Sequence, residues 1–288
     1  MVSLISNPVS GKFNIDKKFE LLTPIAKHFK SEIYGLDTIS KTEFKNCLKD
    51  LSKKDNEICV AGGDGTLLDV LNTVDKNIII SYIPMGSGNA IKKSFYSPQI
   101  SKKFYDNIFN KIINGKINYV DTINCNGIYS FLAGIGLDAL VAFKREEMIK
   151  NGIHGFKSYS KAFFNVFKQG FSKYPTEISL DNCCLKTEIS TLIASKTTHY
   201  GYNLQVMPEA NINDSFIHIR TLPPSSFEIA KGLVSGFLQN QIAGTHYLSH
   251  SLKIKTKLPI YIHLHGTPFQ PTNEINMNIE PKSFKFRY

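Results

Sequence analysis

A Gly-Gly-Asp-Gly-Thr segment at residues 62–66 carries the strongest chemical signal in the sequence. It lies between an apolar, strand-like run at 57–61 and a helix-like run at 66–74. Glycines let the backbone come close to a ligand, and successive N–H groups at the start of a helix suit phosphate oxygens. A carboxylate in such a loop suits a bridging Mg²⁺ ion or serves as a base for a hydroxyl nucleophile. The alternative is a tight strand-to-helix turn in which Asp64 caps the helix.

Two more loops of small residues follow neighbouring strand-like runs. Residues 7–12 read Asn-Pro-Val-Ser-Gly-Lys after a run at 2–6, and residues 84–90 read Pro-Met-Gly-Ser-Gly-Asn-Ala after a run at 78–83. The spacing of a Walker P-loop is absent, and no G-x-G-x-x-G follows a strand. Three such loops at one edge of a sheet favour a shared nucleotide site over three independent turns.

The first part of the chain alternates strand-like and helix-like runs. Strands are expected at 2–6, 32–36, 57–61 and 78–83, and helices at 19–29, 42–51, 66–74 and 103–114. This alternation predicts an α/β domain with a mostly parallel sheet covered by helices. Ligands of such sheets bind beyond the carboxyl ends of the strands, where the three loops and Thr38 fall.

The pattern changes after the helix that ends near residue 114. Strand-like runs dominate at 117–124, 129–133, 177–180, 187–194, 216–222, 252–254 and 259–264, and helices are expected at 139–150, 155–170 and 226–239. Runs of strands after an α/β half predict a second, β-rich and mainly antiparallel domain. We place the domains at residues 1–122 and 123–273.

Composition limits the class of protein. The hydrophobic fraction of 42% supports a sizeable core, and the net charge of +10 favours an anionic partner such as a membrane, a polyphosphate or nucleic acid. The charge is scattered and does not choose among these partners. Nucleic acid is not expected as a partner, because only the charge would support it. Five cysteines without C-x-x-C spacing predict neither disulfides nor a zinc site. No run has the length of a signal peptide or a spanning helix, so a cytoplasmic protein is expected.

The three loops, in this order and spacing, resemble the nucleotide loops of the diacylglycerol kinase catalytic domain. The Gly-Ser-Gly-Asn-Ala form at 86–90 is similar to the sphingosine kinase version. The resemblance continues through Gly-Ile-Gly-Leu-Asp-Ala at 134–139 and reaches Pro-Glu-Ala at 208–210 and Asp-Ser at 214–215. It implies transfer of the ATP γ-phosphate to a hydroxyl of diacylglycerol or a sphingoid lipid, with Mg²⁺, by a protein attached peripherally to the membrane. It also implies that residues 274–288 return to complete the first domain.

The resemblance implies roles for individual residues. Asp64 matches the family's catalytic aspartate, credited with base or metal-binding duty, and Asp138 matches a position that contacts the lipid headgroup. An N-cap for the helix that follows is the alternative for Asp138. Asp69 is expected to form a salt bridge inside the first domain. The positions that match nucleotide-binding residues are Asn7, Thr38, Gly62, Gly63, Gly65, Thr66, Gly86, Ser87 and Asn89.

One departure from the family is large. Family members carry Asp-Gly-Glu near the C-terminus, whereas this chain has His265-Gly266-Thr267. An imidazole acts as a base near pH 7 but does not replace a carboxylate on Mg²⁺. Either His265 and Asp64 share the chemistry, or the protein is a catalytically weak or silent relative that binds nucleotide or lipid. An NAD kinase, which also uses a Gly-Gly-Asp-Gly loop, is a further alternative. His263 and His265 would share a strand face, so a metal site there is also conceivable.

Overall fold

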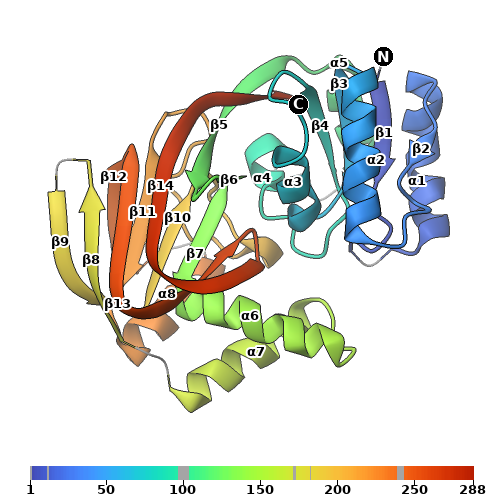
Figure 1. Ribbon diagram of the computed structural model, residues 1–288. Helices are drawn as coiled ribbons and strands as arrows, with labels where there is room; N and C mark the ends of the chain where they lie inside the picture. Colours follow the sequence, from blue (N-terminus) through green and yellow to red (C-terminus); the bar gives the residue numbers. More distant parts are fainter. Residues whose placement is uncertain (1, 12, 97–103, 171–172, 182, 239–242) are drawn as a thin grey trace. The chain divides into compact units, whose positions relative to one another are not determined.

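The computed structural model describes the chain except for residues 1, 12, 97–103, 171–172, 182 and 239–242 (Figure 1). Lys12 and Lys103 of the sequence predictions therefore lie outside the described residues. The chain forms two compact units. The first unit comprises Met1–Val120 and Lys282–Tyr288, and the second comprises Asp121–Pro281.

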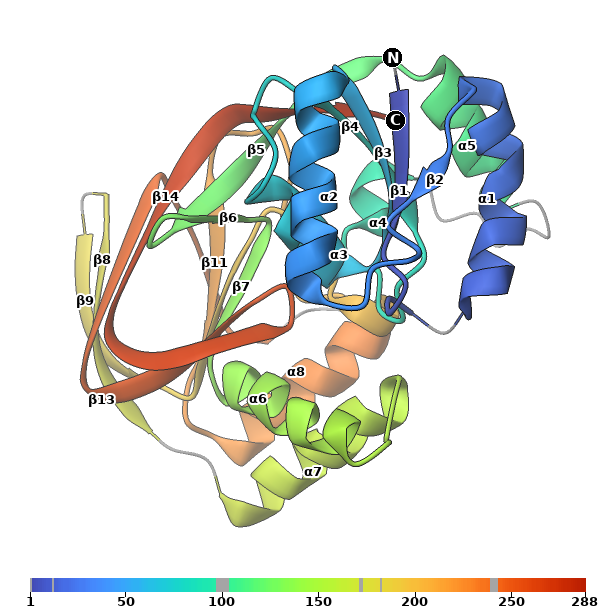
Figure 2. The same cartoon turned by 45° about the vertical axis from the view of Figure 1, so that its right-hand side comes forward.

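A parallel sheet forms the centre of the first unit. Its strands lie in the order β4, β3, β1, β2, and each neighbouring pair is parallel. Helices α1 and α5 cover one face, and α2 and α3 cover the other (Figure 2). The elements are β1 (Val2–Ser6), α1 (Ile15–Phe29), β2 (Ile33–Tyr34), α2 (Lys41–Lys54), β3 (Glu57–Gly62), α3 (Asp64–Leu71), β4 (Ile79–Pro84), α4 (Lys92–Phe95) and α5 (Phe104–Asn114).

Local sequence explains where the elements of the first unit begin and end. Ser40 caps α2 by accepting from the N–H of Glu43, whose carboxylate accepts in turn from the N–H of Ile39. Strand β2 is shorter than the predicted 32–36, because Gly35 turns the chain at a φ of 82°. The predicted structural salt bridge of Asp69 is confirmed: Lys41 and Lys45 of α2 each lie 3.1 Å from its carboxylate.

The C-terminal residues complete the first unit. The end of β14 (Thr267–Arg287) pairs in parallel with β4, with Lys285 opposite Ile79. Phe286 stacks on Phe95 with 4.7 Å between ring centroids, and Arg287 binds both carboxylate oxygens of Glu57 at 2.8 Å. The resemblance implies a return at residue 274, whereas in the structure the chain returns to the first unit at Lys282. The preceding part of β14, up to Asn278, pairs with β13 instead.

The second unit is built on antiparallel strands. Strands β12, β11, β10, β7, β13 and β14 lie side by side, and the β8–β9 hairpin pairs with β13. Strand β5 (Ile117–Cys125) leads into the unit. The other elements are β6 (Ile128–Ser130), β7 (Leu132–Gly136), α6 (Leu137–Lys150), α7 (Phe156–Gln169), β8 (Tyr174–Leu180), β9 (Cys183–Ile189), β10 (Thr191–Ser195), β11 (Ile217–Leu222), α8 (Ser226–Leu238), β12 (Thr245–Ser249) and β13 (Ser251–Leu264).

The predicted fold class is confirmed: an α/β unit with a mostly parallel sheet is joined to a unit rich in antiparallel strands. Strand β13 is continuous where the sequence suggested two strands, and β14 and β12 were not predicted. Helices α6, α7 and α8 share one apolar cluster, in which Leu137 and Val141 pack with Ala162, Val166 and Ile229. In the described part of the chain, no helix is long and apolar enough to span a membrane.

Candidate functional site

The three loops predicted from the sequence leave the carboxyl ends of β1, β3 and β4, which are neighbours in the parallel sheet. Asn7 connects the first loop to the second. Its side-chain Nδ2 donates to the hydroxyl of Thr66 at 3.0 Å, and its backbone N–H donates to the carbonyl of Ala61 at 3.1 Å. The structure therefore brings the Asn-Pro loop and the Gly-Gly-Asp-Gly-Thr loop together at one edge of the sheet.

The second loop also contacts the third. The carbonyl of Gly62 accepts from the N–H groups of Met85 at 2.8 Å and Gly86 at 3.1 Å, and from the hydroxyl of Tyr82 at 3.2 Å. A Cβ placed on Gly86 would lie 2.4 Å from the Cα of Gly63. The glycines are thus needed for backbone-to-backbone packing between loops, in addition to the approach of a ligand that the sequence suggested.

Asp64 lies at the first residue of α3, but its side chain does not cap that helix. Its two carboxylate oxygens accept from the N–H groups of Ala90 at 3.0 Å and Ile91 at 3.4 Å, in the segment before α4. Burial raises the pKa of Asp64, and the backbone N–H groups counteract that rise. The proposed catalytic aspartate is therefore held in a fixed position by the third loop.

The remaining predicted nucleotide residues differ in their contacts. Asn89 adopts a φ of 50° and donates from Nδ2 to the carbonyl of Gly86 at 2.8 Å, which closes the third loop. Thr38 donates to the carbonyl of Gly35 at 2.7 Å, within its own turn. Gly65 lies in the first turn of α3, and Ser87 lies in the third loop. The nucleotide role of Thr38 therefore stays a prediction.

Lys18 is a member of this site that the sequence analysis did not identify. The residue belongs to α1 and is buried, and its ammonium donates to the carbonyls of Asn7 and Pro8, each at 2.7 Å. Burial lowers the pKa of Lys18 to about 8. A positive charge is thus fixed directly beneath the first loop. Its position near the start of an amphipathic helix gave no sign of this contact.

In the second unit, Asp138 belongs to a polar cluster with Tyr200 and His263. Its Oδ2 atom accepts from the hydroxyl of Tyr200 at 2.6 Å and lies 2.7 Å from Nε2 of His263. The N–H of Gly266 donates to Nδ1 of His263 at 3.0 Å, so Nε2 carries the proton that faces Asp138. Burial alone would raise the pKa of Asp138, but His263 and Tyr200 outweigh it and hold the pKa below its ordinary value. The alternative of an N-cap is wrong, because α6 begins at Leu137 with Gly136 as its cap.

His265 lies in a turn and does not share a strand face with His263. Together with Gly266 it forms the two-residue connection between β13 and β14, with φ values of 51° and 76° as in a type I′ turn. The N–H of Phe131 donates to Nε2 of His265 at 2.9 Å, while Nδ1 is buried without a hydrogen-bond partner in the described structure. Burial lowers the pKa of His265 to about 3. The lone pair that a base would use is engaged by the backbone, so this geometry does not favour His265 as the base.

A second polar network holds the segment that contains Asp214. The buried ammonium of Lys196 lies 2.5 Å from Asp214 and 3.2 Å from Asp121, and Asp214 also lies 2.6 Å from Nε2 of His218. Arg220 binds the carboxylate of Glu209 at 2.6 and 2.8 Å. The Pro-Glu-Ala and Asp-Ser segments that carried the family resemblance thus have structural partners within the second unit.

The described side chains alone form no metal centre. Within the described residues, no group of three or more His, Cys, Asp or Glu side chains is placed to hold a metal ion. The metal site considered for His263 and His265 is therefore not supported. The structure holds Cys47, Cys59, Cys125, Cys183 and Cys184 as free thiols.

Comparison with known proteins confirms the resemblance. Residues 1–125 match the model of the diacylglycerol kinase catalytic domain. The diacylglycerol kinase of Staphylococcus carnosus is 26% identical over 74% of this chain and 69% of its own length, and that of Bacillus subtilis is 24% identical over 76% and 72%. An uncharacterised protein of Synechocystis is 25% identical over 97% of this chain and 68% of its own length. The first part of the chain thus carries a diacylglycerol kinase-like catalytic domain.

Solved structures support the same fold. A diacylglycerol kinase from Bacillus anthracis has a TM-score of 0.75 at 16% identity, covering 100% of this chain and 96% of that protein. An NAD kinase from Archaeoglobus fulgidus, solved in complex with ATP, has a TM-score of 0.53 at 12% identity, covering 100% and 94%. The two kinase classes share this architecture, and the fold of the chain is closer to the former.

Proposed function

We propose that this protein is an ATP-dependent kinase that transfers the γ-phosphate to a hydroxyl group of diacylglycerol or a sphingoid lipid. The observation that carries the proposal is the interlocking of three loops at the carboxyl edge of the parallel sheet. Asn7 binds Thr66, Gly62 binds the third loop, and Asp64 binds the segment before α4. This edge lies within residues 1–125, which match the catalytic domain of a lipid kinase family.

Each part of the loop cluster has a chemical task in this proposal. The backbone N–H groups of the glycine loops bind phosphate oxygens, and the buried ammonium of Lys18 adds a fixed positive charge beneath the first loop. Fixed positive charge and N–H dipoles stabilise the charge on a transferring phosphoryl group without reorganisation. Asp64, oriented by Ala90 and Ile91, is the candidate to polarise the acceptor hydroxyl.

The residues of the loop cluster fit a magnesium ion only when that ion is also bound by the phosphates of ATP. Mg²⁺ commonly takes one or two protein carboxylates together with substrate phosphates and water. Asp64 supplies one such carboxylate, and the described residues form no resident cage. When bound, the ion would neutralise phosphate charge.

We propose that the Asp138 cluster binds the headgroup of the lipid that accepts the phosphate. Both hydrogen bonds of Asp138 use Oδ2, from Tyr200 and His263, so within the described residues Oδ1 makes none. The side chain is 25% exposed, and its depressed pKa keeps it ionised near pH 7. An ionised oxygen with free lone pairs accepts a hydrogen bond from a headgroup hydroxyl, which is a charge-assisted and comparatively strong contact.

The test is incubation of the purified protein with γ-labelled ATP and vesicles that contain diacylglycerol or sphingosine. We expect label in a lipid product, and loss of that label in Asp64→Asn. Label in NADP on addition of NAD, without lipid product, would instead favour the NAD kinase class.

A second candidate function is that of a catalytically silent binding protein. It is favoured by His265, which replaces the family's aspartate and whose Nε2 is occupied by the N–H of Phe131. Thr267 in place of the glutamate removes a second carboxylate. ATP binding by calorimetry, without labelled lipid at any pH, would establish this function and refute the kinase proposal.

A further inference from the structure

Helix α8 presents an apolar face that the second unit does not cover. Phe227, Val234 and Leu238 are 72%, 59% and 63% exposed, and their spacing of seven and four residues places them on one side of the helix. Lys231 is exposed on the same side. Single exposed apolar residues are ordinary, but several large ones on the same side of a helix indicate a binding surface.

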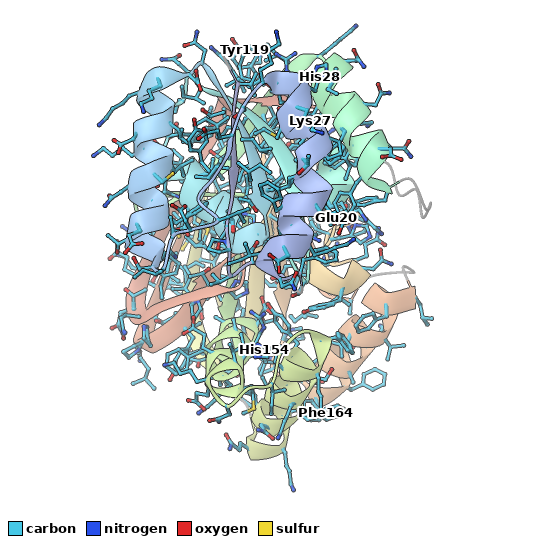
Figure 3. All side chains as sticks on the ribbon, turned by 90° about the vertical axis from the view of Figure 1, so that its right-hand side faces the viewer. Glu20, Lys27, His28, Tyr119, His154 and Phe164 are labelled. Atoms are coloured by element: carbon cyan, nitrogen blue, oxygen red, sulfur yellow. The ribbon has the colours of Figure 1, made fainter. Side chains whose placement is uncertain are left out.

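Helix α7 adds positive charge and a further exposed aromatic ring. Its exposed side chains include Lys157, Lys161 and Lys168 together with Phe164, which is 69% exposed and is labelled in Figure 3. The sequence of the helix, Phe-Lys-Ser-Tyr-Ser-Lys-Ala-Phe-Phe-Asn-Val-Phe-Lys-Gln, contains no acidic residue. Its exposed side therefore combines cations with apolar surface.

The two helices are held to one another, so these side chains belong to a fixed platform. Phe156 at the start of α7 meets Phe237 near the end of α8 edge to face, with 6.2 Å between ring centroids. Ala162 and Val166 of α7 share an apolar cluster with Ile229 of α8. We call the exposed sides of this pair the α7–α8 surface, defined by Phe164, Phe227, Val234, Leu238 and the lysines of the two helices.

We propose that the α7–α8 surface docks the protein on an anionic lipid bilayer. Exposed phenylalanine, valine and leucine side chains gain free energy by entering the apolar layer, and Lys157, Lys161, Lys168 and Lys231 attract acidic headgroups. A symmetric dimer formed through this surface would bring two positively charged surfaces together, and like charges disfavour that arrangement. The inference rests on the proposed function in one respect: a bilayer-resident acceptor requires the enzyme to reach the bilayer.

The absence of tryptophan from the sequence allows a direct test. Phe227→Trp places a single indole on the α7–α8 surface, and Leu258→Trp places one at a control position on β13 that is 70% exposed. With vesicles of equimolar phosphatidylglycerol and phosphatidylcholine, we expect the fluorescence of F227W, but not of L258W, to shift to shorter wavelength. Equal behaviour of the two variants would overturn the proposal.

Two further sets of variants separate the apolar and charged contributions. Phe227→Ser with Leu238→Ser should weaken co-sedimentation with these vesicles by about 100-fold, whereas Leu258→Ser should not. Changing Lys157, Lys161 and Lys168 to glutamine should weaken it by about 100-fold at low salt. The same change at Lys186, Lys255 and Lys257, exposed lysines of the β strands in the same unit, should have little effect.

The outcomes separate this inference from the proposed function. Vesicle binding is measured without ATP, so binding through α7 and α8 in a protein that transfers no phosphate would leave the inference standing. If the protein phosphorylates a short-chain, water-soluble diacylglycerol but does not bind vesicles, the inference is refuted and the proposed kinase function is supported. A concentration-dependent dimer in sedimentation, abolished by F227S with L238S, would assign the surface to self-association and overturn the proposal.

Discussion

His265 and Phe131 are joined by a hydrogen bond of 2.9 Å, in which the backbone N–H of Phe131 donates to the imidazole Nε2 of His265. The two residues are 134 positions apart in the sequence, and both are buried. The contact fixes the histidine tautomer and ties the β13–β14 turn to the backbone before β7. It gives a structural reason for histidine at a position where the family resemblance implies aspartate.

This contact predicts a specific loss of stability in acid. The pKa of His265 is about 3 in the folded protein and near 6.5 when unfolded, so between these values the unfolded chain binds the extra proton. Stability should therefore fall as the pH drops below 6.5, by about 3 kcal/mol at pH 4 from this residue. Between pH 7 and pH 4, urea unfolding should show a smaller loss of unfolding free energy for His265→Asn than for wild type. His28→Asn changes an exposed histidine and is the control. It should lose as much unfolding free energy as wild type.

Lys18 predicts that ATP binding weakens in mild alkali. The pKa of Lys18 is lowered to about 8, so its positive charge beneath the first loop is present below pH 8 and lost above it. Affinity for ATP should fall on the order of tenfold between pH 7 and pH 9.5, because an attractive charge near the phosphates disappears. Lys18→Arg, which stays charged, should retain affinity over this range. Calorimetry that shows the same pH profile for both proteins would remove Lys18 from the nucleotide site.

The loop glycines predict a graded effect on ATP binding and stability. A methyl group on Gly86 would lie 2.4 Å from the Cα of Gly63, whereas one on Gly63 would lie 3.0 Å from the Cα of Gly86. Gly86→Ala should therefore disturb the loops more than Gly63→Ala, and both should weaken ATP binding. Gly232→Ala in α8 is the matched control, because its nearest neighbours lie 3.7 Å away and alanine favours a helix. Gly86→Ala should have the lowest ATP affinity and the lowest melting temperature, and the control should equal or exceed wild type. Both quantities are measured for each variant.

The sequence predicted the loop cluster because one rule of parallel sheets places the carboxyl ends of β1, β3 and β4 at the same edge. It did not predict the partners of Asp138, because Tyr200 and His263 lie 62 and 125 residues further along the chain. Such pairings depend on how antiparallel strands align, and strand pairing between distant segments has no local signal.

Other differences have local physical causes. Strand β14 was not predicted because apolar and polar residues do not alternate regularly along it. Many of its side chains are exposed or half-buried. His265 was placed on a strand because the His-Leu-His pattern alternates, whereas the following glycine, with a φ of 76°, allows a two-residue turn. The turn changes the expected direction of the histidine ring.

The decisive prediction concerns the carboxylates of the proposed catalytic site. Asp64 is held by the N–H groups of Ala90 and Ile91, and if it polarises the acceptor hydroxyl, Asp64→Asn should lower the transfer rate by about 100- to 10,000-fold. Asp69→Asn is the matched control, since this carboxylate of α3 binds Lys41 and Lys45. It should lower thermal stability and leave the rate of the folded protein nearly unchanged.

The complementary variant restores the family's acids by combining His265→Asp with Thr267→Glu. Aspartate followed by glycine suits the type I′ turn that His265 and Gly266 now form, so the hairpin should persist. The double variant should transfer phosphate faster than wild type if missing carboxylates limit the reaction, and Thr267→Glu alone should give a smaller gain. Initial rates with γ-labelled ATP and diacylglycerol vesicles measure both effects. If instead wild type is active and His265→Ala abolishes transfer without unfolding the protein, the histidine is the base despite its bond to Phe131.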